Sequence, residues 1–156
     1  MKVNVNDVAP KFSLYSSEKE LINLEDFKGQ KVLLLFFPQA FTGVCTKELC
    51  ATRDGLGTYE DLDAKVLAIS VDSVYTLAKF KEVEKLNFPL LSDFNKEVIE
   101  MYGCVHETFN PGMKGVAKRS EFVIDNEGIV RYANVKDSPA DFPDFDKIKE
   151  VLKSID

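Results

Sequence analysis

The chain has 156 residues, so we expect one domain spanning residues 1–156. Its 20 Lys and Arg against 26 Asp and Glu give a net charge of −6, which disfavours binding to nucleic acid or to an anionic membrane. The 45% hydrophobic content excludes a disordered chain, and the absence of a long apolar run or a signal-peptide pattern predicts a cytoplasmic location.

The first half of the chain predicts a hairpin followed by a parallel crossover unit. Residues 11–24 are expected to form two short strands around a turn at 16–18. The apolar run at 31–38 ends in a proline and predicts a strand that is covered on both faces. Helix formers follow at 46–53, and a second apolar run at 64–71 predicts another strand. Strand, helix and strand in this order indicate a parallel pair.

The second half predicts a helix, a short strand, a short helix, a hairpin and a terminal helix. The predicted ranges are 74–86, 88–91, 95–102, 122–132 and 144–155. Ser73 and Asp144 are expected to cap the two longer helices. Apolar residues recur every third position from Val74 through Val83 to Leu86, which predicts one buried stripe. The fold class is therefore α/β, a central mixed β-sheet flanked by helices.

The strongest chemical signal is a cysteine directly after the first long strand. Functional residues of open α/β sheets gather at the carboxyl ends of strands. Cys45 is expected in the first turn of the next helix, where unpaired backbone N–H groups and the helix dipole stabilise negative charge. The thiolate is the nucleophilic form of cysteine. Cys45 is therefore predicted to be a nucleophile.

The neighbours of Cys45 suit a peroxide as the electrophile. Thr42 offers a hydroxyl that can donate or accept a hydrogen bond near the sulfur, or cap the helix. Pro38 has no N–H and supplies a rigid, dry wall. Attack on a peroxide also needs cationic donors for the charge that moves onto the departing oxygen. An arginine suits this task because it stays protonated.

The run Pro38-x-x-x-Thr42-x-x-Cys45 resembles the active-site signature of the peroxiredoxins, which are thiol peroxidases with a thioredoxin-like fold. Similarity covers nearly the whole chain, including residues 8–12, 90–93, 118–125 and the terminal helix. The resemblance implies that Cys45 is the peroxidatic cysteine and that Pro38, Thr42 and Arg119 form its pocket. It also implies that Glu48 orients the arginine, and that the single thioredoxin-like domain carries an N-terminal β-hairpin extension.

Within the family the chain resembles two groups. Cys45-x-x-x-x-Cys50 is similar to the bacterioferritin comigratory protein (PrxQ) group, in which the second cysteine resolves the oxidised first. Residues 36–45 are more similar to the one-cysteine AhpE group. The first resemblance implies reduction of hydrogen peroxide and small organic hydroperoxides, a Cys45–Cys50 disulfide, and recycling by a thioredoxin-like dithiol; the second implies an external resolving thiol. Both imply antioxidant defence without a cofactor, in a monomer or a homodimer.

Helix geometry adds a condition to the disulfide. Five residues along an α-helix separate two Cα atoms by roughly 8.6 Å, from a rise of about 7.5 Å and a turn of about 140°. Disulfides need a Cα separation of about 4.4–6.8 Å. We therefore expect oxidation to unwind the first turns of the helix, helped by Gly55 and Gly57.

Other interpretations of the function of the cysteines remain open from the sequence. Cys45, Cys50, Cys104 and His106 together offer the donors of a Cys3His zinc site, although the gap between the last two is unusually short. Cys104 is expected to be an inert core residue, with a resolving role if Cys50 has none. His106 is expected at the surface or in a loop. A redox-sensing adaptor would use the same oxidation, whereas a disulfide reductase lacks its C-x-x-C motif.

Overall fold

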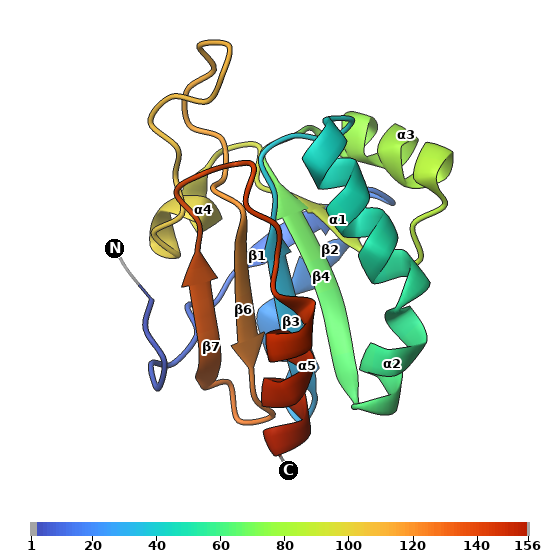
Figure 1. The fold of residues 1–156 in the computed structure, drawn as a ribbon, viewed down its shortest axis with the longest axis vertical. Helices are drawn as coiled ribbons and strands as arrows, with labels where there is room; N and C mark the ends of the chain where they lie inside the picture. The colour runs from blue at the N-terminus through green and yellow to red at the C-terminus, as the bar shows by residue number, and fades with distance from the viewer. Residues whose placement is uncertain (1–2, 156) are drawn as a thin grey trace.

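The computed structural model describes residues 3–155, which build one seven-stranded mixed sheet with helices on both faces (Figure 1). The strand order is β2-β1-β5-β4-β3-β6-β7. The strands are β1 (Ser13–Ser16), β2 (Leu21–Asn23), β3 (Lys31–Phe36), β4 (Ala64–Ser70), β5 (Leu90–Ser92), β6 (Ser120–Ile124) and β7 (Val130–Val135). The helices are the 3-10 turn η1 (Leu24–Phe27) and the α-helices α1 (Gly43–Asp54), α2 (Leu56–Asp61), α3 (Val74–Glu84), α4 (Glu97–Met101) and α5 (Phe145–Ser154).

β3 lies at the centre of the sheet because its apolar run can fill both faces. It pairs in parallel with β4 and antiparallel with β6. Leu33 and Leu35 belong to the core on one face, and Leu34 and Phe36 belong to the core on the other. All four side chains are inaccessible to solvent. A continuous apolar strand is the pattern expected for a strand that is covered on both sides.

Different elements cover the two faces of the sheet. The first face packs against α1, α2, α3 and α5, through residues that include Leu49, Phe80 and Leu152. The opposite face packs against η1, α4 and the segment 102–117, and it includes Tyr102 and Cys104. In Figure 1 this segment continues upward as the orange loop above the sheet. A residue's position on one face or the other therefore decides which partners it can reach.

Most of the predicted elements are confirmed, with changes in their limits. The N-terminal hairpin forms as β1 and β2, and β1 joins the main sheet by pairing antiparallel with β5. Ser73 accepts the Thr76 N–H and Asp144 accepts the Lys147 N–H, so both predicted caps are confirmed. α1 begins at Gly43, three residues earlier than predicted. Neither η1 nor α2 was predicted.

One predicted buried stripe is wrong in part. Leu77 and Phe80 of α3 are buried, but Val83 is 50% exposed. A repeat of three residues advances by 300° on an α-helix, so each step turns the stripe by about 60° away from the core. Val83 therefore faces solvent. No helix among residues 3–155 has the length and apolar character needed to cross a membrane.

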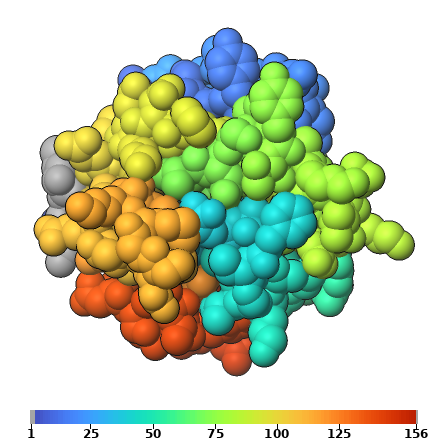
Figure 2. All heavy atoms as spheres, turned by 90° about the horizontal axis from the view of Figure 1, so that it is seen from above, coloured from blue at the N-terminus to red at the C-terminus, as the bar shows by residue number. Residues whose placement is uncertain are grey.

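The topology brings three distant parts of the chain to one end of the sheet. β3 ends at Phe36, α1 begins at Gly43, and the antiparallel β6 begins at Ser120 at the same end. Figure 2 views the molecule from this side: the segment around residue 40, in cyan, lies between the orange loop and green α3. Residues that immediately precede α1 and β6 therefore meet here.

Candidate active site

Cys45 is the third residue of α1 and is fully buried as a free thiol. The helix starts where it does because Thr42 takes an extended conformation and its carbonyl accepts the first helical hydrogen bond, from the Thr46 N–H at 2.9 Å. Cys45 lies within the first turn, whose backbone N–H groups have no partners inside the helix. The predicted position of Cys45 at a helix start is confirmed, and this environment favours negative charge on the sulfur.

Arg119 connects Cys45 to Glu48. Its Nη2 donates to the Cys45 Sγ at 3.3 Å, and its Nη1 donates to Glu48 Oε1 at 2.5 Å. Nη2 also donates to the carbonyl of Pro139 at 3.0 Å, in the segment after β7. Arg119 is 1% exposed and Glu48 is fully buried, so the ion pair is shielded from water. One guanidinium therefore holds the sulfur and the carboxylate on the same side of α1.

Burial governs the charge on Glu48. It raises the pKa of Glu48 to about 7, although the attraction of Arg119 acts in the opposite direction. Burial lowers the pKa of Arg119, but Glu48 and Cys45 more than offset this and the net change is upward. Arg119 therefore stays a cation, while Glu48 can hold or release a proton near neutral pH.

The raised pKa of Glu48 predicts how the free energy of unfolding depends on pH. A carboxyl group that binds its proton more tightly when folded stabilises the fold below its unfolded pKa near 4.5, and this stability is lost as pH rises through about 7. Relative to Glu48→Gln, the wild-type free energy of unfolding is expected to fall by about 3 kcal/mol across this window. Urea unfolding at a series of pH values measures the difference.

The matched control is Glu60→Gln on α2, where the side chain is exposed. This variant is expected to keep the wild-type dependence of stability on pH. A Glu48→Gln curve that runs parallel to the wild-type curve would contradict the prediction.

Pro38 and Thr42 form the loop in front of Cys45. Pro38 is buried, as expected of a dry wall. The Thr42 hydroxyl donates to the carbonyl of Gln39 at 2.9 Å, and it makes no side-chain cap hydrogen bond. Thr42 is the N-cap residue of α1, as expected, but its hydroxyl bonds to the preceding loop and not to the helix. This hydrogen bond holds Thr42 at the entrance to α1.

Asp72 also stabilises this loop by a hydrogen bond, and the sequence analysis did not predict this role. Asp72 Oδ2 accepts the Ala40 N–H at 2.8 Å and the Ser70 hydroxyl at 2.6 Å. Phe41 takes a left-handed conformation with a φ of 68°, which is costly for a side chain of this size. Asp72 lies two residues after the end of β4, the neighbour of β3. Its place at the carboxyl end of an adjacent parallel strand was the signal that could have identified it.

Cys50 lies on the same helix as Cys45, as predicted, but it contacts different residues. Its thiol donates to Glu84 Oε2 at 3.6 Å, and the carbonyl of Glu84 accepts Nη1 of Arg53 at 2.5 Å. Burial raises the pKa of Cys50; Glu84 adds to this rise and Arg53 opposes it. The Cys50 thiol is therefore tied to the end of α3 and held in its protonated form.

Cys104 and His106 lie away from Cys45. Cys104 belongs to the core on the opposite face of the sheet, where burial raises its pKa to about 12. The expectation that it is an inert core residue fits this position, whereas Cys45 belongs to the core on the other face of the sheet. His106 lies in the loop 105–117 but is only 7% exposed, so a surface position is wrong. It is covered because its ring packs against Phe109.

The four zinc donors considered from the sequence do not come together. Cys45 and Cys104 lie on opposite faces of the sheet. Among residues 3–155, no group of three or more His, Cys, Asp or Glu side chains is arranged to hold a metal ion. The proposed Cys3His zinc site is therefore wrong, because a sequence gap does not tell on which face a residue lies.

The sequence analysis also did not predict a second buried ion pair, between Glu121 and Lys136. Glu121 of β6 is fully buried and pairs with Nζ of Lys136, which is 8% exposed. Burial raises the pKa of Glu121, and Lys136 opposes the rise. The hint in the sequence was one charged residue next to the apolar run 122–124 of a buried strand. The Pro139 carbonyl, a further partner of Arg119, left no side-chain signal at all.

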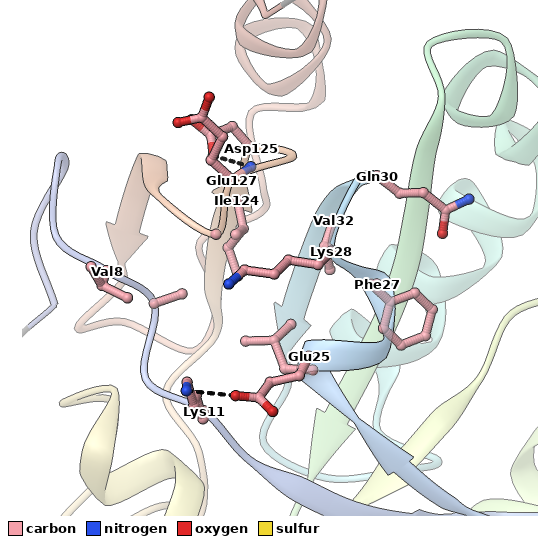
Figure 3. Close-up of a pocket in the computed structure, with 13 residues that line it drawn as sticks. Val8, Lys11, Glu25, Phe27, Lys28, Gln30, Val32, Ile124, Asp125 and Glu127 are labelled. Atoms are coloured by element: carbon pink, nitrogen blue, oxygen red, sulfur yellow. Dashed lines mark hydrogen bonds and ion pairs between the residues drawn. The ribbon is translucent and has the colours of Figure 1, made fainter.

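A separate cavity is shown in Figure 3. It holds about 70 Å³ and is lined by residues that include Lys28, Val32 and Ile124. Val32 lies near the start of β3 and Ile124 at the end of β6, so this cavity is at the opposite end of the sheet from Cys45. The Lys11–Glu25 ion pair closes one side of it. Its lining includes no cysteine.

Comparisons with known proteins agree with this geometry. The chain matches the AhpC/TSA family over residues 5–133. It is 41% identical over 137 residues to alkyl hydroperoxide reductase E of Mycobacterium tuberculosis, which covers 86% of each chain. It is 39% identical over 131 residues to peroxiredoxin Bcp of Escherichia coli, which covers 83% of this chain and 84% of that protein.

Solved structures agree as well. The crystal structure of peroxidoxin BcpB from Mycobacterium tuberculosis superposes with a TM-score of 0.87 at 30% identity, covering 99% of both chains. The expected thioredoxin-like peroxiredoxin fold with its N-terminal hairpin is confirmed. The chain belongs to the AhpC/TSA family, and it is a peroxiredoxin, a thiol-dependent antioxidant peroxidase.

Proposed function

We propose that Cys45 reduces hydrogen peroxide and small organic hydroperoxides, that Cys50 resolves it, and that a thioredoxin-like dithiol restores both. The observation that carries this proposal is the contact of 3.3 Å between Arg119 Nη2 and the sulfur of Cys45 at the start of α1. Complete burial of Cys45 favours small peroxides over bulky ones. The cycle needs no cofactor, and a cytoplasmic location suits three free thiols because that compartment is reducing.

In the first step the Cys45 thiolate attacks one oxygen of the peroxide. An S–O bond forms, the O–O bond breaks, and the departing oxygen leaves with the electron pair and takes up a proton. Cys45 is oxidised by two electrons to a sulfenic acid, and the peroxide is reduced to water or an alcohol. Arg119 stays charged and stabilises the negative charge that moves along the O–O axis. Glu48 holds the guanidinium in place by accepting a hydrogen bond from Nη1 of Arg119.

In the second step Cys50 first gives up the proton of its thiol, and the resulting thiolate attacks the sulfur of the sulfenic acid. An S–S bond forms, the S–O bond breaks, and hydroxide leaves and is protonated to water. With α1 intact, the two Cα atoms are roughly 8.6 Å apart, beyond the reach of a disulfide. Cys50 must also leave the carboxylate of Glu84. Local unwinding of α1 is therefore part of the step, and Gly55 at its end offers a flexible point.

In the third step an external dithiol attacks the disulfide by thiol–disulfide exchange. One of its thiolates attacks the disulfide, forms a mixed disulfide with one cysteine and releases the other. Its second thiolate then attacks the mixed disulfide and releases the remaining cysteine. Both cysteines return as thiols, and the dithiol leaves as a disulfide. A thioredoxin-like protein has the required pair of thiols.

The resolving role is tested with Cys50→Ser. The variant is expected to react with one equivalent of peroxide as fast as wild type, because Cys45 is untouched. It is expected to lose at least about nine-tenths of its turnover with a thioredoxin system, because the sulfenic acid then has no internal partner. Peroxide consumption measures turnover, and thiol counting after oxidation measures disulfide formation.

Cys104→Ser is the matched control, since it removes a cysteine from the opposite face of the sheet. It is expected to behave as wild type in both assays. Full turnover of Cys50→Ser would instead support the second candidate, a one-cysteine cycle with an external resolving thiol. The contact of the Cys50 thiol with Glu84, on the side away from Arg119, favours that alternative.

A further inference from the structure

The Glu121–Lys136 ion pair has no role in the cycle described above. Both side chains are buried, and an ion pair is costly to remove from water unless its partners compensate each other. Glu121 lies two residues after Arg119, and alternate residues of a strand point to the same face. The pair therefore lies on the face of the sheet that carries α1 and Cys45.

The strand register places Lys136 directly beside Arg119. Ser120 pairs with Val135, and the Lys136 N–H donates to the carbonyl of Arg119 at 3.0 Å, which continues the register by one position. Two cations that are directly opposite on one face of an antiparallel pair repel each other. Here Glu48 accepts from Arg119 and Glu121 accepts from Lys136, so each cation is paired with its own carboxylate.

These four side chains form a balanced quartet: Glu48, Arg119, Glu121 and Lys136. With all four ionised, their charges sum to zero while Cys45 is a thiol, and the site gains one negative charge when Cys45 becomes a thiolate. Neither Glu48 Oε2 nor Glu121 Oε2 has a hydrogen-bond partner in the part of the chain that is described. Each carboxylate therefore has one oxygen whose negative charge is not compensated by a hydrogen bond. In such a poorly solvated interior, the charge of one side chain acts on others over longer distances than in water.

We propose that Glu121 and Lys136 are positioning residues that control how readily Cys45 ionises, by completing the charge balance around Arg119 and Glu48. This inference rests on the proposed role of Cys45 as the peroxidatic cysteine. Other ionisable groups near the quartet are Asp144 at the start of α5, whose charge acts on Glu121, Tyr132 of β7, and His106, on which the charge of Arg119 acts. All three remain in place in every variant below.

The sign of each substitution follows from the charge that it leaves behind. Lys136→Met leaves Glu121 without its cation, so an added thiolate is disfavoured at any pH at which Glu121 is ionised. Glu121→Gln leaves the ammonium of Lys136 without its carboxylate, so a thiolate is favoured. The double variant Glu121→Gln/Lys136→Met removes both charges and restores a sum of zero. A purely structural role would not give effects of opposite sign.

The experiment measures the rate constant of reduced protein with hydrogen peroxide in a single turnover, as a function of pH. We expect the midpoint of the profile to rise by about one pH unit in Lys136→Met and to fall by about one in Glu121→Gln, each a roughly tenfold change in rate at a fixed pH below the midpoint. The double variant and Lys136→Arg are expected to keep the wild-type midpoint. Circular dichroism and thermal melts confirm that each variant is folded.

Coincident midpoints for both single variants and wild type, or shifts of both in the same direction, would overturn the inference. Should Lys136→Met not fold, Glu121→Gln and the double variant carry the test, because a downward shift and its reversal are both specified in advance. Failure of the proposed function is distinct: Cys45→Ser would then react with peroxide as fast as wild type, whatever the charge variants do.

Discussion

Replacing Cys45 with serine is expected to abolish peroxide reduction, with a loss of activity on the order of a thousandfold or more. The hydroxyl of serine stays protonated at neutral pH and is a poor nucleophile toward a peroxide oxygen, even beside Arg119. The contact between the guanidinium and the side chain would remain, so binding is kept and the chemistry is lost. Single-turnover reaction with hydrogen peroxide, followed by peroxide consumption, measures this directly.

Serine differs from cysteine by one atom, so Cys45→Ser is expected to fold as wild type does. Cys104→Ser is the appropriate comparison, since Cys104 is equally buried but lies in the other core. It is expected to retain full single-turnover activity. If Cys45→Ser retained more than about a tenth of the wild-type rate, another group would have to be the nucleophile.

Arg119→Met is expected to lower the rate constant for the reaction with peroxide by about 10²–10³-fold. Methionine roughly preserves the apolar stem, but it removes the donor to the Cys45 sulfur and the charge that would stabilise the departing oxygen. Both effects act on the transition state, so the loss appears in the chemical step. Stopped-flow measurement of the first oxidation isolates that step from recycling by the dithiol.

Two further variants separate charge from packing at Arg119. Arg119→Lys keeps the charge but cannot contact Cys45 and Glu48 with two nitrogens of one planar group, so an intermediate rate is expected. Arg119→Met/Glu48→Gln avoids a buried carboxyl group without its cation, and it is expected to be as slow as Arg119→Met. A folded Arg119→Met protein within threefold of wild type would show that the guanidinium has no part in peroxide reduction.

Local patterns in the sequence predicted the elements that depend on nearby residues. The cap of α5 is an example: Asp144 accepts an N–H three residues later, so a short stretch contains both the signal and its partner. The position of Cys45 after a buried strand and at the start of a helix is predictable for the same reason. The family signature of Pro38, Thr42 and Cys45 is equally local.

Contacts between residues far apart in the sequence could not be predicted from local patterns. Arg119 is 74 positions from Cys45, and the resemblance to a family, rather than any spacing, indicated that the two belong together. The Thr42 hydroxyl was expected near the sulfur or at a cap, but it donates to Gln39 because of the sharp backbone at Phe41. His106 was expected at the surface or in a loop; it lies in the loop 105–117, but the hairpin within that loop covers it.

By itself, then, the sequence determined the order of the strands, the caps at Ser73 and Asp144, the position of Cys45 at a helix start and the membership of a thiol peroxidase family. Only the tertiary structure decided that Cys104 lies behind the sheet from Cys45, that Cys50 contacts Glu84, and that Glu121 and Lys136 complete a buried charge quartet. The physical reason is one of range. Caps and strand patterns depend on residues a few positions apart, whereas burial and charge balance depend on the register and face of strands that the chain brings together from far away.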